Sequence, residues 1–95
     1  MNYGHAIKVA RTRRGMSQKQ LAGRIKADSS FLSMLESGKR KPSTETLEAI
    51  CDVLGVPLYL LMLLASEKKD LKGVSAAQAA DLGRQLLDIL IKGVD

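Results

Sequence analysis

The apolar residues of this chain recur mostly at intervals of three and four, which is the spacing of an amphipathic helix. Near the start, Tyr3, Ile7 and Ala10 follow this spacing, while the basic residues Lys8, Arg13 and Arg14 point elsewhere. Gly15 ends the pattern, because glycine readily takes the left-handed conformation found after helices. We therefore predict a first helix from Tyr3 to Arg14.

The next stretch predicts two short helices joined by a tight turn. Ser17 and Gln20 form a capping-box pair that starts one helix, and Asp28 is a suitable N-cap for the other. Gly38 is placed to end the second of them. Their apolar residues are Leu21 and Ile25 in one helix and Leu32 and Leu35 in the other. Helices of about two turns are not stable alone. Neighbouring helices must hold them, and one face of the second remains free.

A fourth and a fifth helix follow. Ser43 caps the fourth, which Gly55 ends, and Pro57 suits the first turn of the fifth, which runs to about Leu64. The buried stripe of the fourth helix consists of Leu47, Ile50, Cys51 and Leu54. The fifth is apolar all round, so we expect another element to cover its outer side.

A second capping box, Ser75 with Gln78, predicts a sixth helix from Ala76 to about Lys92. Its wide apolar stripe can complete the core of a single chain, or it can pack on the fifth helix and still face a second chain. We expect dimerisation, because exposed apolar patches of this kind usually mark interfaces. The expected dimer interface consists of Tyr59, Leu60, Leu82, Leu86, Leu87, Leu90 and Ile91.

Composition adds limits to this picture. Aromatic residues make up 3% of the chain, so its core must be aliphatic. The single cysteine, Cys51, excludes an internal disulfide, fits a reducing compartment and lies on an apolar stripe as a small core residue. No apolar run reaches the ~20 residues of a membrane span, and the first residues lack the apolar centre of a secretion signal. We expect a soluble, cytoplasmic protein that does not enter membranes.

The charge is unevenly distributed. The net charge is +5, with +8 on residues 1–41 and −3 on residues 42–95. Such an imbalance favours a polyanion-binding face, although a solvated basic surface without a partner would give the same count. The sequence offers no carboxylate pair, metal-ligand cluster or phosphate-cradling glycine loop, and His5 reads as a surface residue. We expect no enzymatic activity, no metal and no cofactor.

A set of linked positions between Ile7 and Leu64 carries a family resemblance. The positions are Arg11, Gly15-Met16-Ser17-Gln18, Leu21-Ala22, Leu32, Leu35-Glu36, Gly38, Lys39 to Ser43 and Leu47. In this order they resemble the lambda-repressor/Cro-like helix-turn-helix family, also called the XRE family. The resemblance implies an all-α fold with a five-helix DNA-binding domain over residues 1–66. The residue pattern, and not the resemblance, adds a charged connector and a C-terminal dimerisation helix over residues 67–95.

Two structural details also come from the resemblance. Arg11 and Glu36 are paired in this family, so an ion pair is implied, although the two charges could instead be solvated independently. The family usually has glycine in the turn between the second and third helices, where this chain has Lys26. If the backbone there is left-handed, a non-glycine residue costs about 1–2 kcal/mol.

The resemblance further implies that the helix over residues 28–37 lies in the major groove of DNA. The expected base-contacting residues are Ser29, Ser30, Phe31, Ser33 and Met34. None is the Arg, Asn or Gln that makes bidentate base contacts, so we expect modest base selectivity from this helix. Phe31 is as well explained as a half-buried packing residue.

Contacts to the DNA backbone are expected on both sides of that helix. Gln18 matches a family position that binds phosphate at a helix start. The full set of expected phosphate contacts is Gln18, Ser37, Lys39, Arg40 and Lys41, with Arg14 and Lys19 as further candidates. The expected function is a homodimeric transcriptional repressor that reads a palindromic double-stranded DNA site. The alternative is a protein-interaction module, such as an antitoxin or a coactivator bridge, whose partner binds the C-terminal helix.

Overall fold

The computed structural model describes residues 1–67, 69–70, 73, 75–78, 80–81 and 83–85. Its elements are α1 (Tyr3–Arg13), α2 (Gln18–Arg24), α3 (Ser29–Glu36), α4 (Thr44–Leu54) and α5 (Leu58–Ala65). Residues 76–78, 80–81 and 83–85 are helical as well, and no strand occurs among the described residues. The predicted all-α class is therefore confirmed, with five helices that end within one or two residues of the predicted bounds.

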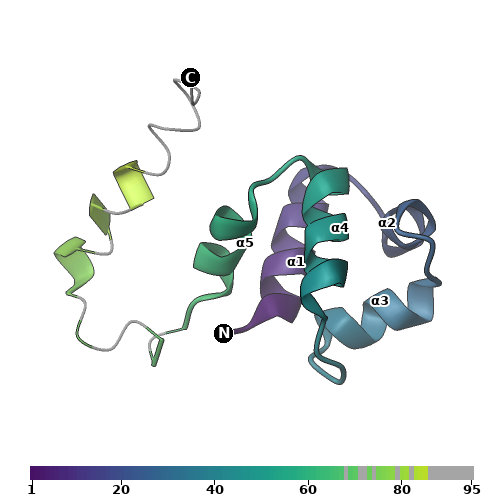
Figure 1. Ribbon diagram of the computed structural model, residues 1–95, viewed down its shortest axis with the longest axis horizontal. Coiled ribbons are helices and arrows are strands. Elements are labelled where there is room, and N and C mark those ends of the chain that lie inside the picture. Colours follow the sequence, from purple (N-terminus) through teal and green to yellow (C-terminus); the bar gives the residue numbers. More distant parts are fainter. Residues whose placement is uncertain (68, 71–72, 74, 79, 82, 86–95) are drawn as a thin grey trace.

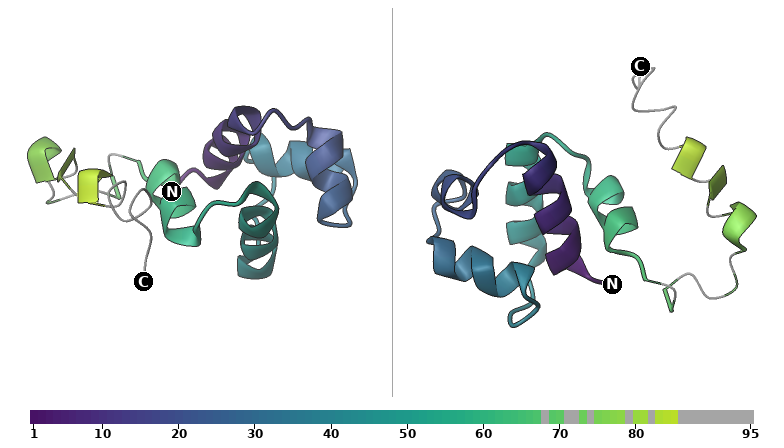
Figure 2. Two further views of the ribbon diagram at one scale, coloured as in Figure 1. Left: turned by 90° about the horizontal axis from the view of Figure 1, so that it is seen from above. Right: turned by 180° about the vertical axis from the view of Figure 1, so that it is seen from behind.

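The helices pack around α1, which contacts α3, α4 and α5. In Figure 1, α1 and α4 lie side by side in the centre, with α5 on one side and α2 and α3 on the other. The views in Figure 2 show the same arrangement from above and from behind. This packing leaves the outer side of α3 and the outer side of α5 uncovered by the other four helices.

The buried side chains are the apolar stripes that the sequence pattern predicts. Seven large residues are almost completely buried: Ile7, Leu21, Leu32, Leu35, Ile50, Leu54 and Leu61. Cys51 is buried among them, and this burial raises the pKa of its thiol. Among the described residues, none that is polar or charged is buried as a whole residue, although the side chain of Glu36 is 4% exposed. The core is aliphatic, as the composition requires.

The predicted helix starts have the expected hydrogen bonds. The Ser17 hydroxyl accepts from the Gln20 N–H at 3.0 Å, and the Gln20 side chain accepts from the Ser17 N–H at 2.8 Å. Asp28 accepts from the Phe31 N–H at 2.8 Å. Ser43 caps α4 in the same way. These caps fix where α2, α3 and α4 begin.

Helices α1 and α3 cross at Gly4, which is buried. A Cβ atom on this residue would overlap the carbonyl oxygen of Leu35 and would lie 2.7 Å from that of Glu36. The backbone of α1 therefore rests directly on the last turn of α3. This contact sets the position of α3 relative to the rest of the fold.

None of the described helices is by itself long and apolar enough to cross a membrane; α4 and α5 reach that length and hydropathy only as a pair bent by 108°. Within the same residues, no group of three or more His, Cys, Asp or Glu side chains is placed to hold a metal ion. The expected interface residues Leu82, Leu86, Leu87, Leu90 and Ile91 lie outside the described residues, as does the predicted end of the sixth helix at Lys92.

The turn between α2 and α3 contains a strained residue. Lys26 has φ = 58° and is the only non-glycine residue with positive φ among those described. We expect Lys26→Gly to stabilise the fold by about 1 kcal/mol, because glycine takes this conformation without the steric cost. Thermal unfolding of the variant should show a higher melting temperature. Lys26→Ala, which removes the charge but keeps the strain, should leave the melting temperature nearly unchanged. A lower melting temperature for Lys26→Gly would contradict this account.

Candidate nucleic-acid interface

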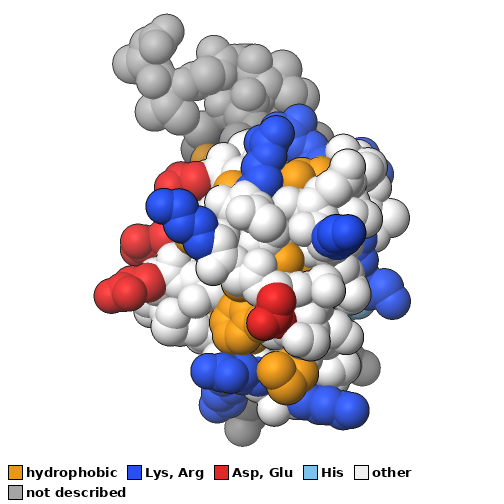
Figure 3. All heavy atoms as spheres, turned by 90° about the vertical axis from the view of Figure 1, so that its right-hand side faces the viewer, with side chains coloured by type: hydrophobic (Ala, Val, Ile, Leu, Met, Phe, Trp, Pro, Cys, Tyr) orange, Lys and Arg blue, Asp and Glu red, His pale blue; other side chains and the backbone are white. Residues whose placement is uncertain are grey.

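The outer face of α3 is a continuous exposed strip. Its inner residues, Leu32 and Leu35, are buried against the core. The exposed residues of the strip are Ser29, Ser30, Ser33, Met34 and Ser37. Figure 3 views the side of the molecule that carries α2 and α3: basic side chains lie around much of its edge, acidic side chains lie along one flank and near the centre, and the rest is mainly uncharged. The basic side chains can therefore meet an anionic ligand at the edge of this face.

The serine hydroxyls of this strip differ in availability. Ser30 donates to the Asp28 carboxylate at 2.7 Å, and Ser37 donates to the carbonyl of Met34 at 3.2 Å. Ser29 and Ser33 make no side-chain hydrogen bond within the described part of the chain. Donation from the Ser30 hydroxyl and from the Phe31 N–H holds the pKa of Asp28 below its usual range. Within the strip, Ser29 and Ser33 are thus the hydroxyls most available to a ligand.

Phe31 is half-buried and packs against the core. The guanidinium carbon of Arg40 lies 5.0 Å from the centroid of its ring, which is the geometry of a cation–π contact. Phe31 thus has the contacts of a half-buried packing residue. It also contacts Arg40, which the sequence analysis expected only as a phosphate contact.

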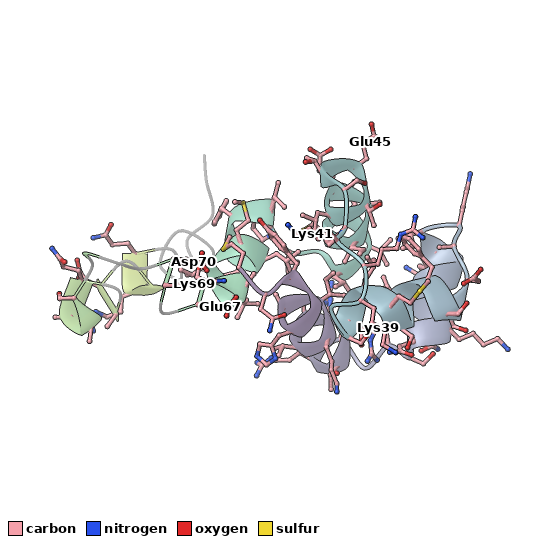
Figure 4. The ribbon with its side chains drawn as sticks, turned by 90° about the horizontal axis from the view of Figure 1, so that it is seen from below. Lys39, Lys41, Glu45, Glu67, Lys69 and Asp70 are labelled. Atoms are coloured by element: carbon pink, nitrogen blue, oxygen red, sulfur yellow. The ribbon has the colours of Figure 1, made fainter. Side chains whose placement is uncertain are left out.

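That basic loop folds back onto the end of α3. Gly38 has φ = 79°, and the N–H groups of Lys39 and Arg40 both donate to the carbonyl of Met34, at 3.0 and 3.2 Å. The side chains of Lys39, Arg40 and Lys41 are exposed. Figure 4 shows Lys39 and Lys41 on the loop next to α3. Three positive charges therefore follow the exposed strip directly.

The same loop borders an open pocket of about 430 Å³ whose other walls come from residues 1–4, from Leu35 and from the segment after α5. Arg40 and Lys41 line it on the loop side, and Glu67 and Lys69 line it on the other. Figure 4 shows Glu67, Lys69 and Asp70 together beside α5. The segment that leads toward residues 75–85 is thus placed near the basic loop.

The start of α2 carries Gln18 and Lys19. Lys19 is exposed, whereas Gln18 is half-buried and donates from its side-chain amide to Glu36 at 3.1 Å. The amide of Gln18 therefore has a partner within the protein. The backbone N–H groups at the start of α2 remain a suitable anion site because they carry the positive end of the helix dipole.

Arg14 follows the end of α1, and its side chain extends to the end of α4. Its Nε donates to the carbonyl of Leu54 at 2.6 Å, and its guanidinium lies against Gly55, the residue that ends α4. Carbonyl groups at the end of a helix attract cations, which explains this placement. The structure gives Arg14 a role in holding α4 that the sequence analysis did not anticipate.

Arg11 and Glu36 form an ion pair that connects three helices. Arg11 donates to the two carboxylate oxygens of Glu36 at 2.7 and 3.0 Å, and to the carbonyl of Met16 at 2.7 Å. Their side chains are 12% and 4% exposed. The hydrogen bond to Glu36 raises the pKa of the Arg11 guanidinium. With Gln18 on the same carboxylate, this network fixes the ends of α1 and α3 to the start of α2.

The outer side of α5 is apolar and exposed. Tyr59, Met62 and Leu64 are 43%, 39% and 42% exposed, and Leu60 is half-buried. The sequence pattern indicated Tyr59 and Leu60, because both follow the start of an all-apolar helix. Met62 and Leu64 were missed, although the same pattern would have included them.

Comparisons with known proteins extend this description. A family model described as Helix-turn-helix matches residues 7–61, which include the whole of α2, α3 and α4. The transcriptional regulator ClgR of Mycobacterium tuberculosis is 31% identical over 65 residues, or 68% of this chain. The immunity repressor protein of Bacillus phage phi105 is 38% identical over 62 residues, or 65% of this chain.

Two solved structures of one regulator have a similar fold. Two crystal structures of the clp gene regulator ClgR from Corynebacterium glutamicum each match with a TM-score of 0.66. One is 28% identical, over 67% of this chain and 83% of that one; the other is 31% identical, over 90% and 86%. The sequence alignments cover 58% of the M. tuberculosis relative and 43% of the phage relative, so this chain spans about half the length of the curated relatives it matches.

Proposed function

This chain belongs to the lambda-repressor/Cro-like (XRE) helix-turn-helix family, and on that basis we propose that it binds double-stranded DNA and regulates transcription. The observation that carries the proposal is the exposed strip of α3 with the basic loop next to it. In helix-turn-helix proteins, a helix in this position enters the major groove. Residues 1–66 then form the DNA-binding domain.

In this proposal the two kinds of contact come from different segments. Ser29, Ser33 and Met34 reach base edges from α3, the hydroxyls through hydrogen bonds and Met34 through apolar contact with thymine methyl groups. Lys39, Lys41 and Lys19 bind phosphates on either side of the groove, with the N–H groups at the start of α2. The phosphate contacts supply most of the affinity, and the base contacts supply the sequence preference.

The protein acts as a homodimer in this proposal, with residues 67–95 as connector and dimerisation segment. The exposed apolar side of α5, formed by Tyr59, Met62 and Leu64, supports an interface there, because monomers rarely expose contiguous apolar surface. A two-fold dimer reads a palindrome whose half-sites lie about one helical turn apart. Repression follows when such a site overlaps a promoter, and the phage relative is named an immunity repressor.

Selection of bound sequences from a random pool of DNA duplexes tests this function. We expect enrichment of a palindrome with half-sites about 10 base pairs apart, centre to centre. Enrichment of a single half-site would contradict the dimer. If no sequence is enriched, specific DNA binding is wrong, and the apolar side of α5 would then favour the protein-interaction module. That alternative predicts a tight protein partner that purifies with the chain in place of the homodimer.

The dependence of binding on salt separates the two kinds of contact. If six phosphates are neutralised per dimer, the logarithm of the affinity should fall with the logarithm of salt concentration with a slope of about −5. Lys39→Ala should weaken binding to all sequences alike and reduce the slope by about 0.9 per protomer. Ser33→Ala should leave the slope unchanged and alter the preferred sequence instead.

The matched control for Lys39 is Lys8→Ala, which removes the same charge from an exposed position of α1. Binding titrations by fluorescence anisotropy at several salt concentrations give the slopes of the unaltered chain and of the three variants. An equal loss of slope in Lys8→Ala and Lys39→Ala would mean that overall charge, and not a contact from the loop, controls the affinity.

A further inference from the structure

The exposed strip of α3 lacks the side chains that usually read bases. It consists of four serines and one methionine, and none has two donors in a fixed geometry. Strong discrimination of one base comes most often from an arginine that donates to O6 and N7 of guanine. A guanidinium for this purpose would have to come to the strip from another segment of the chain.

Arg40 meets this requirement through the path of the basic loop. Its N–H donates to the carbonyl of Met34 at 3.2 Å, so the chain has already turned back toward α3 at this residue. Its guanidinium carbon then lies 5.0 Å from the ring centroid of Phe31, one helical turn before Met34. The side chain therefore runs back along the side of α3, toward the N-terminal half of that helix.

The contact with Phe31 orders the guanidinium without consuming its donors. A guanidinium above an aromatic ring interacts through its charge and its flat face, while its N–H groups point outward in its own plane. Among the residues that the structure describes, the Arg40 guanidinium has no hydrogen-bond or ion-pair partner. Phe31 is itself held by its packing against the core.

On the premise of the DNA-binding function above, we propose that Arg40 is a base-reading residue. Its guanidinium enters the major groove beside α3 and donates two hydrogen bonds to O6 and N7 of a guanine. Phe31 is its positioning residue and does not itself read a base. The roles of these two residues thus differ from those expected from the sequence, where Arg40 was a phosphate contact and Phe31 a base contact.

The position of the guanidinium beside α3 brings two kinds of target within reach. The major groove is about 12 Å wide, and an α-helix with its side chains has a diameter of about 10–12 Å, so a group against the side of the helix meets both base edges and the groove wall. We take a base as the target because the exposed strip of α3 supplies no other side chain with two donors in a fixed geometry. Variants of Arg40 separate a base contact from a phosphate contact.

The test compares the sequences that full-length variants select from a random duplex pool, followed by titrations on the selected site. The unaltered chain should enrich a guanine at one fixed position of each half-site, and replacement of that guanine should weaken binding about tenfold or more. Arg40→Lys, which keeps the charge, should lose most of this discrimination. Lys39→Ala is the control: it should bind more weakly but select the same guanine.

Two further variants test the positioning role of Phe31. Phe31→Tyr keeps an aromatic face and should retain the guanine preference, whereas Phe31→Leu should lose most of it. Circular dichroism establishes that each variant is folded. If Phe31→Leu is unfolded, Phe31→Met, which fills a similar volume without an aromatic face, takes its place, and a guanine preference equal to that of the unaltered chain overturns the positioning role.

The possible outcomes separate the base-reading role of Arg40 from DNA binding itself. If Arg40→Lys and Arg40→Ala weaken binding to every sequence by one factor and select the same site, Arg40 contacts only the backbone. The inference is then overturned, while DNA binding stands. If the unaltered chain enriches no sequence, the proposed function fails and this inference fails with it.

Discussion

Gly4→Ala is expected to destabilise the protein by about 2–3 kcal/mol, although alanine is the better helix former. The new methyl group would overlap the carbonyl oxygen of Leu35 and lie 2.7 Å from that of Glu36. Both obstacles are backbone atoms, which cannot move aside as the end of a flexible side chain can. The start of α1 must therefore separate from the end of α3, and the buried Ile7 beside it must lose contacts.

The chain supplies a matched control in Gly23. This residue is also inside a helix, but it is exposed and no atom lies within 4 Å of where a Cβ would be. Gly23→Ala should stabilise the protein by about 0.5–1 kcal/mol through helix propensity alone. Urea unfolding of the two variants should thus give changes of opposite sign. If Gly4→Ala is as stable as the unaltered chain, α1 and α3 are not in the close contact described here.

The contrast between Gly4 and Gly23 could not be predicted from the sequence. Both lie in helices, and the local pattern treats them alike, because hydrophobic spacing reports which face of a helix is buried and not how near another backbone comes. Helix starts, in contrast, depend on neighbours in sequence. The caps at Ser17, Asp28 and Ser43 could therefore be predicted, and so could the left-handed residue at Lys26 once the family's turn glycine was known.

In the candidate site, too, some features could be predicted from the sequence and others could not. The exposed strip of α3 could be predicted from Leu32 and Leu35, because these two residues mark the buried face of the helix and the opposite face is then exposed. The position of Arg40 could not be predicted, because it depends on the left-handed Gly38 and on hydrogen bonds that turn the loop back to Met34. Arg14 similarly meets Leu54, forty residues later in the chain, and only the packing of α1 against α4 brings the two together.

Arg11→Ala is the second substitution for which we expect a large effect. It removes three hydrogen bonds and leaves the Glu36 carboxylate, whose side chain is 4% exposed, without its cation. Loss of one partner of a buried ion pair costs about 3–5 kcal/mol, mainly because the other charge stays buried and uncompensated. We expect about 3 kcal/mol here, since the Arg11 side chain is 12% exposed and water can partly compensate. Urea unfolding monitored by circular dichroism measures the loss.

A double variant separates the cost of the orphaned charge from the value of the pair. Arg11→Met with Glu36→Leu replaces both charges by apolar groups of similar size, so it should be clearly more stable than Arg11→Met or Glu36→Leu alone. If instead the double variant loses as much as these two single variants together, the two residues are not coupled, and the loss in Arg11→Ala does not come from the uncompensated carboxylate. A loss below about 1 kcal/mol for Arg11→Ala would mean that solvent screens Glu36 as it screens surface pairs.

The same network makes Arg11 matter for DNA binding without a contact to DNA. Glu36 also accepts from Gln18, so its carboxylate joins the start of α2 to the end of α3. These are the two segments proposed to hold a phosphate and to enter the groove. Under conditions where Arg11→Ala is still folded, its affinity for the selected site should fall while its preferred sequence stays the same, because the base-reading side chains are unchanged and only the positions of the helices that carry them are less well fixed.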